Sequence, residues 1–358
     1  IGEDGNVVAV HDHEPSAVEA GAVVKTADVA LPGFVDLHNH GVGGTEDVTT
    51  YWSNPWFTLE RLKAAGTTAT LATLVVPSSA TSHIGCAAEL PSVLDAVGVV
   101  RAGHAVCEGL HAEGPVVADL GGLPPSETAM PLDRFKEMLD GLPGLRIMTI
   151  SPHMDAPSGY SRIQELLSRG VVPALGHDKK ATEDEILGAL RVCAAAGPDA
   201  PRPHLTHLYN VTTFHHRNVG LTNVGLLSEF PRTPKYEGIV EPSAEIILDL
   251  VHVHALCIQL ALTSKDHSRL CFVTDGIAEP VVGTTIGYQG RSMEVMDTRD
   301  HPDLKASETP GACVVLSGTT TLAGSCTNML SIFRSLVRVF GLELGAASRL
   351  VSETPASI

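Results

Sequence analysis

From residue 31 onward, short apolar runs alternate with longer amphipathic stretches. Apolar runs of strand length lie near residues 34–40, 68–76, 106–113, 146–151, 171–177, 203–209, 245–251 and 270–275. Amphipathic stretches of helical length separate most of them, including residues 131–142, 160–169, 183–196 and 254–263. Strands that alternate with helices form parallel sheets, and eight such units close into a barrel. The pattern therefore predicts an α/β fold built on a (β/α)8 TIM-type barrel.

Three segments depart from this alternation and predict the domain organisation. Residues 1–30 hold short β-type runs between turn residues, which predicts the N-terminal β segment of a small β-sandwich appendage. The barrel is expected over residues 31–350, with a β-hairpin insertion at about 277–321 and a closing helix near 327–340. Residues 351–358 are expected to begin the return to the sandwich, which we expect to be incomplete in this chain.

Charge and cysteine content narrow the classes of partner. The formal net charge is −17, with 41 acidic against 24 basic residues, so we expect neither nucleic acid nor an anionic membrane as a partner. The 7 cysteines form no C-x-x-C pair, which is typical of free thiols in a reducing compartment. The most apolar long segment, residues 245–263, is interrupted by Asp249, His252 and His254 and is no membrane span. We therefore expect a soluble, cytoplasmic protein.

The first apolar run ends in a His-x-His pair followed by glycines. Because strand side chains alternate between faces, His38 and His40 point the same way and Asn39 points the other way. Imidazole is a ligand for zinc, copper, iron or nickel, so the pair is half of a metal site that needs ligands from elsewhere. The alternative at this point is a pair of solvated loop histidines.

Other polar residues lie where later predicted strands end. Glu113 precedes a Gly-Pro pair, His177 ends the fifth run, and Asp275 ends the eighth. His204 and His207 are three residues apart, so we expect at most one of them to point inward from a strand. The carboxyl ends of barrel strands meet at one mouth, where active sites of this architecture lie. The combination predicts a metal site at that mouth rather than separate packing residues.

These residues stand in stretches that carry a family resemblance. The stretches are PGFVDLHNHG at 32–41, GLHAEGP at 109–115, LGHDKKAT at 175–182, THLYN at 206–210, HRNVGL at 216–221, VTDG at 273–276 and LAGSCTNM at 322–329. In order and spacing the chain resembles the N-acetylglucosamine-6-phosphate deacetylases, a family of the metal-dependent amidohydrolase superfamily. His-x-His and the eighth-strand Asp are shared across the superfamily, whereas the third-strand Glu with THLYN and LAGS is specific to this branch.

The resemblance implies roles for individual residues. Glu113, His177 and His207 correspond to ligands of the metal found throughout the family, and His38 and His40 to ligands of a second metal that some members hold. Asp275 corresponds to the catalytic acid/base. The positions that correspond to substrate contacts are Asn210, Val211, Arg217, His252 and Ala323. The resemblance further implies a homodimer in which Arg217 meets the substrate phosphate near the partner's site.

The chain departs from the family pattern at three places. Asp178 stands where a small Ser is usual, Val211-Thr212 replaces Ala-Met, and His215-His216 adds charge beside Arg217. These departures bear on the shape of the substrate pocket more than on the chemistry. A structural alternative also stays open for His252 and His254, which can form a packed polar pair at the start of a helix.

The expected activity is hydrolysis of the N-acetyl group of N-acetylglucosamine 6-phosphate to glucosamine 6-phosphate and acetate, in amino-sugar catabolism. The expected cofactor is a divalent metal, bound as one or two ions, and Zn²⁺ is the first candidate. A cyclic amidase normally needs a carboxylated lysine on the fourth strand, where residues 146–151 offer none, and a deaminase needs an acid placed differently from Glu113. The alternatives kept are a catalytically silent binder of amino-sugar phosphates and an amidohydrolase for a different amide.

Overall fold

The structure is a computed structural model that describes residues 27–43, 51–76, 90–288, 291–304 and 311–358. The chain divides into two compact units, residues 1–32 and residues 33–358, and every helix and strand described belongs to the second unit. The predicted N-terminal β segment lies almost wholly outside the described residues, so the domain boundaries stay predictions.

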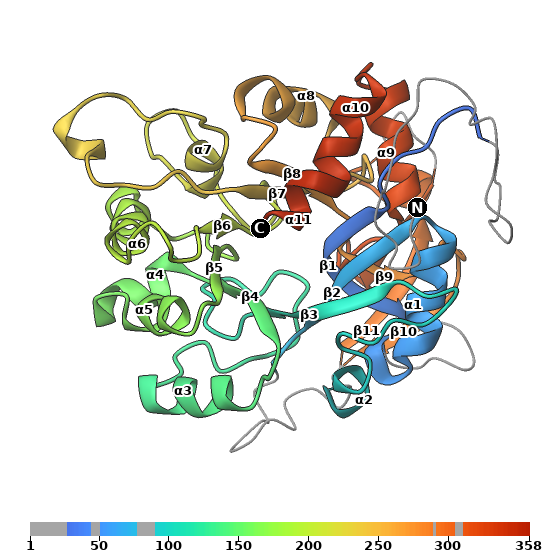
Figure 1. Cartoon of the computed structure of the whole chain (residues 1–358), viewed down its shortest axis with the longest axis horizontal. Coiled ribbons are helices and arrows are strands. Elements are labelled where there is room, and N and C mark those ends of the chain that lie inside the picture. Colours follow the sequence, from blue (N-terminus) through green and yellow to red (C-terminus); the bar gives the residue numbers. More distant parts are fainter. Residues whose placement is uncertain (1–26, 44–50, 77–89, 289–290, 305–310) are drawn as a thin grey trace, which may run out of the picture. The chain divides into compact units, whose positions relative to one another are not determined.

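Eight parallel strands of the second unit form the (β/α)8 barrel that the sequence predicts (Figure 1). They are β1 (Phe34–Gly43), β2 (Thr67–Leu74), β3 (Val106–Glu113), β4 (Leu145–Ile150), β5 (Val172–Leu175), β6 (His204–Leu205), β7 (Ala244–Ile247) and β8 (Leu270–Val273). Strands β1 to β6 pair in sequence order, and β7 pairs with β8. The short strand β9 (Gly276–Ala278) pairs with the other edge of β1.

Two seams join these parallel strands into a ring. At the first seam the Leu205 N–H donates to the carbonyl of Ser243 at 2.9 Å, and the Ser243 N–H donates to Pro203 at 3.0 Å. At the second seam the Asp275 N–H donates to the carbonyl of His38 at 2.8 Å. Both seams therefore lie beside polar residues that the sequence places at the barrel mouth.

Helices follow most strands, with bounds close to those expected. They are α1 (Pro55–Ala64), α2 (Leu90–Leu94), α3 (Leu132–Asp140), α4 (Pro152–Asp155), α5 (Ser161–Ser168), α6 (Glu183–Ala195), α7 (Leu221–Gly225), α8 (Ala255–Ser264), α9 (Met329–Arg338), α10 (Leu344–Ser348) and α11 (Thr354–Ala356). Single turns of other helix types are η1 (Tyr51–Ser53), η2 (Ala156–Ser158), η3 (Pro234–Tyr236), η4 (Thr298–Asp300) and η5 (Arg349–Glu353). The chain thus ends in helical turns, and α11 lies against β1 and β8.

Strand β6 is much shorter than the predicted run 203–209. The backbone leaves the extended conformation after Leu205 and has positive φ angles at His207 (27°) and Tyr209 (83°). The Asn210 N–H donates to the carbonyl of His207 at 2.9 Å and closes a turn. An apolar and aromatic run at this place therefore builds a turn over the mouth instead of a longer strand.

The barrel interior is filled by small and branched apolar side chains. This cluster consists of Leu37, Leu71, Ile147, Val172, Ala174, Ile247, Cys271 and Val273. Ile358 packs against the same cluster. Burial of each Leu, Ile or Val side chain contributes roughly 1.5–3 kcal/mol, so this layer is a firm base beneath the polar mouth.

A small antiparallel sheet lies within the range where we expected a hairpin insertion. Its strands are β10 (Thr285–Tyr288), β11 (Arg291–Asp297) and β12 (Ala312–Leu316), paired in that order. Tyr288 and Met293 of this sheet reach the wall of the pocket at the barrel mouth. The insertion therefore helps to shape the site.

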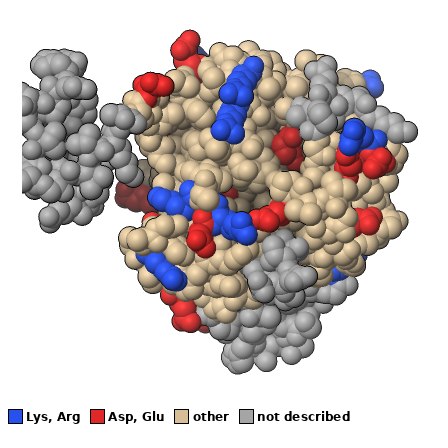
Figure 2. Space-filling view, turned by 90° about the vertical axis from the view of Figure 1, so that its right-hand side faces the viewer, with Lys and Arg blue, Asp and Glu red and all other residues tan. Residues whose placement is uncertain are grey.

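Over the described ranges, no helix is both long enough and apolar enough to cross a membrane. Figure 2 shows blue and red side chains next to one another on the visible face, most of which is uncharged.

Candidate metal and catalytic site

A pocket with polar residues on its floor opens at the carboxyl ends of the barrel strands. Its cavity volume is about 180 Å³. The predicted site residues that line it are His40, Glu113, His177, His207, Asn210, Val211, His252, Asp275 and Ala323. His38 lies beneath its floor with no exposed surface, and Arg217 lies outside it.

Glu113, His177 and His207 come together on one side of the floor. Oε1 of Glu113 lies 2.9 Å from Nε2 of His177 and 2.9 Å from Nε2 of His207. The two Nε2 atoms are 3.0 Å apart, and all three side chains are buried. Three ligand atoms this close can hold one divalent cation.

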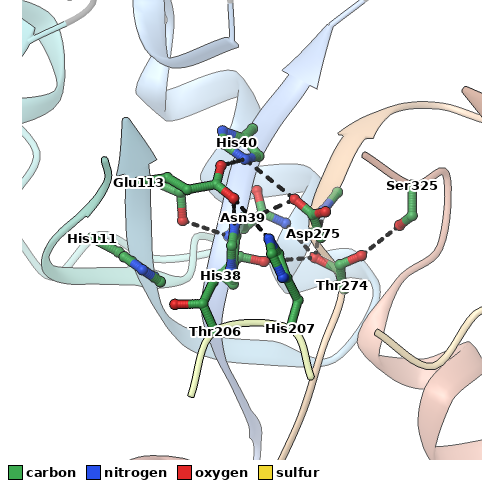
Figure 3. Close-up of polar contacts among 12 residues, drawn as sticks. His38, Asn39, His40, His111, Glu113, Thr206, His207, Thr274, Asp275 and Ser325 are labelled. Carbon is green, nitrogen blue, oxygen red and sulfur yellow. Dashed lines mark hydrogen bonds and ion pairs between the residues drawn. The ribbon is translucent and has the colours of Figure 1, made fainter. Parts of the chain in front are cut away.

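His38, His40 and Asp275 form an adjoining group, and the carboxylate of Glu113 from the first group points toward it (Figure 3). Oδ1 of Asp275 lies 3.2 Å from Nε2 of His40 and 3.4 Å from Nε2 of His38. The second oxygen of Glu113, Oε2, lies 3.1 Å from Nε2 of His40. One carboxylate therefore faces both groups.

The donor set fits a divalent cation. Nε2 of His38 is buried and forms no hydrogen bond with any described residue, although it faces two carboxylates. Imidazole nitrogens and carboxylate oxygens are the ligand types of catalytic zinc sites. These residues therefore provide the ligand types that a divalent metal site needs.

Charges in the cluster are strongly coupled. Burial alone would raise the pKa of Asp275, but the imidazoles of His38 and His40 hold it below its usual value. Burial alone would lower the pKa of His40, but hydrogen bonds to Asp275 and Glu113 raise it to about 9. The carboxylates therefore stay ionised, and a bound cation can replace the positive charge that the imidazoles otherwise carry.

His111 belongs to a third group of potential ligands, with His38 and Glu245, but its ring is already occupied. Its Nδ1 lies 2.9 Å from the carbonyl of Leu37 and its Nε2 lies 3.1 Å from Oγ1 of Thr149. Burial lowers the pKa of His111 to about 3, so the ring is neutral. This group is a packed hydrogen-bonded layer and not a metal site.

The backbone is strained where the site residues leave their strands. φ is 48° at His177, 27° at His207 and 47° at Asp275, a left-handed region that residues with a Cβ seldom adopt. Such conformations concentrate at functional sites, because the surrounding structure must hold them. These strained residues lie two positions beyond the last residues of strands β5, β6 and β8, and their side chains line the mouth.

The prediction that at most one of His204 and His207 points inward is wrong. His204 lies on β6 and His207 lies in the turn beyond it, so the strict alternation of a strand does not apply between them. Both are buried, and both meet Glu245 of β7: Nε2 of His204 lies 3.1 Å from Oε2, and the His207 N–H donates to Oε1 at 3.2 Å.

Sequence reasoning missed Glu245 as a part of the site. This carboxylate is completely buried, and its Oε1 lies 2.6 Å from Nδ1 of His38. The signal available in the sequence was a single acidic residue inside an otherwise apolar run, AEIIL at 244–248.

Two of the residues predicted to contact the substrate present polar groups at the pocket. Nδ2 of Asn210 is buried and has no hydrogen-bond partner among the described residues, and the residue lines the pocket. His252 bonds through Nδ1 to Oδ2 of Asp249 at 2.7 Å, which fixes its ring at the pocket wall. His254 instead caps α8, where its side chain accepts the N–H of Leu256. The pair therefore divides into one pocket residue and one structural residue.

The departures from the family pattern fall at different distances from the pocket. Asp178 faces away from it and accepts hydrogen bonds from Ser151 Oγ at 2.5 Å and from the backbone N–H of Ala181 at 2.7 Å. Val211 lines the pocket wall. Arg217 is exposed in a separate groove that also holds Lys179, Lys180 and Lys235. Of this basic set, Lys179 alone also lines the pocket.

Comparison with known proteins supports the family that the sequence motifs resemble. No protein-family model matches the chain. An N-acetylglucosamine-6-phosphate deacetylase of Bacillus subtilis is 30% identical over 306 residues, which are 82% of this chain and 69% of the relative. One from Lysinibacillus sphaericus is 26% identical over 253 residues, 69% of this chain and 58% of the relative.

A solved structure extends the likeness to the fold. The crystal structure of the Mycobacterium smegmatis N-acetyl-D-glucosamine-6-phosphate deacetylase is 27% identical, has a TM-score of 0.67, and matches 95% of this chain and 82% of that one. The barrel, the converging histidines and carboxylates, and these relatives lead to one assignment. The chain belongs to the N-acetylglucosamine-6-phosphate deacetylase family.

Proposed function

We propose that this chain is the enzyme that hydrolyses N-acetylglucosamine 6-phosphate to glucosamine 6-phosphate and acetate in amino-sugar catabolism. The observation that carries the proposal is the cluster of Glu113, His177 and His207 on the pocket floor, with Asp275 beside it. The names of the relatives support the substrate. Amide hydrolysis at neutral pH needs an activated carbonyl and an activated water, and this cluster can provide both.

We propose Zn²⁺ as the metal. Glu113, His177 and His207 would hold one ion, and His38 and His40, with Glu113 shared, would hold a second where two are bound. When bound, the cation polarises the amide carbonyl and lowers the pKa of water toward ~7. The closeness of the two ligand groups supports this division of the ligands between two ions.

Asp275 is the proposed proton carrier. It is ionised because neighbouring imidazoles lower its pKa, and its carboxylate lines the pocket. It would accept a proton from the attacking water and return it to the nitrogen of the leaving sugar amine. One water is consumed, the C–N bond breaks, and acetate and the free amine result.

We propose that Asn210 and His252 orient the sugar. The unpartnered Nδ2 of Asn210 can donate to a substrate oxygen. The bond of His252 Nδ1 to Asp249 leaves Nε2 for a sugar hydroxyl or the phosphate. Val211 and Ala323 would shape the apolar part of the wall.

We propose that phosphate recognition uses Arg217 of a second subunit together with Lys179 of the same chain. Arg217 lies outside the pocket of its own chain, which supports a role at the partner's site in a homodimer. Among the described residues, Lys179 is the only Lys or Arg that lines the pocket.

We also propose a cytoplasmic location. It is supported by the described cysteines, which are all free.

The test is acetate release from N-acetylglucosamine 6-phosphate by protein stripped of metal and reloaded with Zn²⁺, with metal counting. Unphosphorylated N-acetylglucosamine is the control substrate. Metal-dependent release that requires the 6-phosphate is the expected result. Metal binding without release from either sugar would overturn the proposal in favour of another amide substrate or a silent binding protein.

A further inference from the structure

Glu245 is a completely buried carboxylate beneath the floor of the pocket. Its neighbour on the same face of β7, Ile247, packs in the apolar interior cluster. Burial of an ionised carboxylate is costly unless close partners compensate for lost water. The position therefore needs an explanation beyond packing.

The carboxylate has three partners, and each belongs to a histidine. Oε1 lies 2.6 Å from Nδ1 of His38 and accepts the backbone N–H of His207 at 3.2 Å, and Oε2 lies 3.1 Å from Nε2 of His204. His38 belongs to one proposed ligand group and His207 to the other. One side chain of β7 thus connects both groups from below.

The contact with His38 decides which ring nitrogen can bind a cation. An ionised carboxylate only accepts hydrogen bonds, so the proton of the neutral ring lies on Nδ1. Nε2 then presents its lone pair, and this is the nitrogen that faces Glu113 and Asp275. Carboxylates in this relation to ligating histidines typically fix the tautomer and raise metal affinity.

We propose that Glu245 is a positioning residue for both proposed metal positions. It holds His38 in the tautomer that ligates through Nε2, and it fixes the backbone of His207 at its strained φ of 27°. The inference rests on the proposed metal-dependent function, and it deepens that function by naming the residue that sets cation affinity from outside the ligand set.

The test is zinc binding by metal-free protein, measured by chelator competition for wild type, Glu245→Gln and His204→Gln. The Gln amide can donate to Nδ1 of His38 and so favour the tautomer that cannot ligate through Nε2. We expect Glu245→Gln to lose at least ~10-fold in affinity or to bind fewer ions, the usual range for such outer partners. His204→Gln removes a different partner of Glu245 and should bind zinc within about 2-fold of wild type, a margin well below that range.

A second measurement reads the tautomer of His38 directly in wild-type protein loaded with zinc. Nitrogen-15 NMR of wild-type histidines reports the tautomer of His38, whose signals are identified by their loss in His38→Gln. Protonation of Nδ1 is expected. Protonation of Nε2 in the zinc-loaded protein, or unchanged zinc affinity and stoichiometry in a folded Glu245→Gln, would overturn the inference. Failure of the proposed function would instead appear as zinc-loaded wild type that releases no acetate, and would leave these two readouts unaffected.

Discussion

Asp275 combines three properties that a proton-transferring residue needs. It lines the pocket, it is ionised, and its Oδ1 lies within 3.4 Å of two imidazole nitrogens. Asn has the same shape but cannot accept and return the proton. We expect Asp275→Asn to reduce kcat by at least ~10²-fold, the usual scale for loss of a general acid/base.

The control for Asp275→Asn is the zinc content at Glu113, His177 and His207, which does not need the substituted side chain. Zinc content and substrate-analogue binding should stay close to wild type. Near-normal turnover with retained zinc would rule out the assignment of Asp275.

Lys179 and Lys180 provide a matched pair of positions for testing recognition of the substrate phosphate. Lys179 lines the pocket, whereas Lys180 lines the neighbouring groove and donates from Nζ to the carbonyl of Ala118 at 3.1 Å. A charge-assisted hydrogen bond contributes about 1.5–3 kcal/mol, so Lys179→Gln should raise KM for the phosphorylated sugar about 10-fold or more. Steady-state kinetics with both sugars measures this effect.

Lys180→Gln should leave KM for the phosphorylated sugar unchanged. Lys179→Gln should also leave kinetics with the unphosphorylated sugar unchanged, because that sugar has no phosphate to lose. Equal effects of Lys179→Gln on both sugars would assign Lys179 to general pocket structure instead.

At the scale of elements, helix α6 anchors the segment that follows His177. Thr182 caps its first turn by accepting the N–H of Glu185, and the Glu185 side chain accepts the N–H of Thr182 at 2.8 Å. Loss of such a cap typically costs ~1 kcal/mol. Thr182→Ala should therefore lower the free energy of unfolding by about 1 kcal/mol in denaturant titration, with zinc content unchanged.

Thr182→Ser keeps the capping hydroxyl and is the matched control for Thr182→Ala. It should retain most of the wild-type stability. A loss in the Ser variant equal to that in the Ala variant would mean that the methyl group, not the cap, stabilises this helix start.

Sequence periodicity predicted the barrel elements well because most of them are local. Strand β3 and helix α6 begin where their patterns begin, since apolar spacing and caps are set by neighbouring residues. Strand β6 was overestimated, because the turn at His207 depends on contacts with β7 that no local pattern records.

The same distinction holds for the site. The ligand residues were visible because they lie in the barrel strands or just beyond them, and the carboxyl ends of these strands meet at one mouth. Glu245 was not visible, because its role arises only from the meeting of β7 with His38 and His207 across the barrel. The position of Arg217 outside the pocket likewise depends on the path of its loop.

At the scale of the whole molecule, a mixing experiment tests the proposed homodimer. Arg217→Ala and Asp275→Asn should each be nearly inactive alone. If Arg217 serves the partner's site, a mixed dimer has one site with both residues intact. Mixed and re-equilibrated variants should then recover about a quarter of wild-type activity, from half the dimers with one working site each.

The activity of the mixed sample and its oligomeric state by light scattering together check this complementation. Activity that stays at the level of the separate variants, in a sample that is dimeric by light scattering, would place the action of Arg217 within its own chain. A monomer by light scattering would remove the homodimer from the proposal.

The left-handed backbone at His177, His207 and Asp275 has a consequence for how this protein can be improved. Each such conformation costs roughly 1–2 kcal/mol for a residue with a side chain, and glycine would avoid that cost. Selection for thermal tolerance alone would reward the replacement of these three residues by glycine and so remove the chemistry. Directed evolution of a hardier variant must therefore screen for turnover in every round, because here durability and catalysis compete for the same positions.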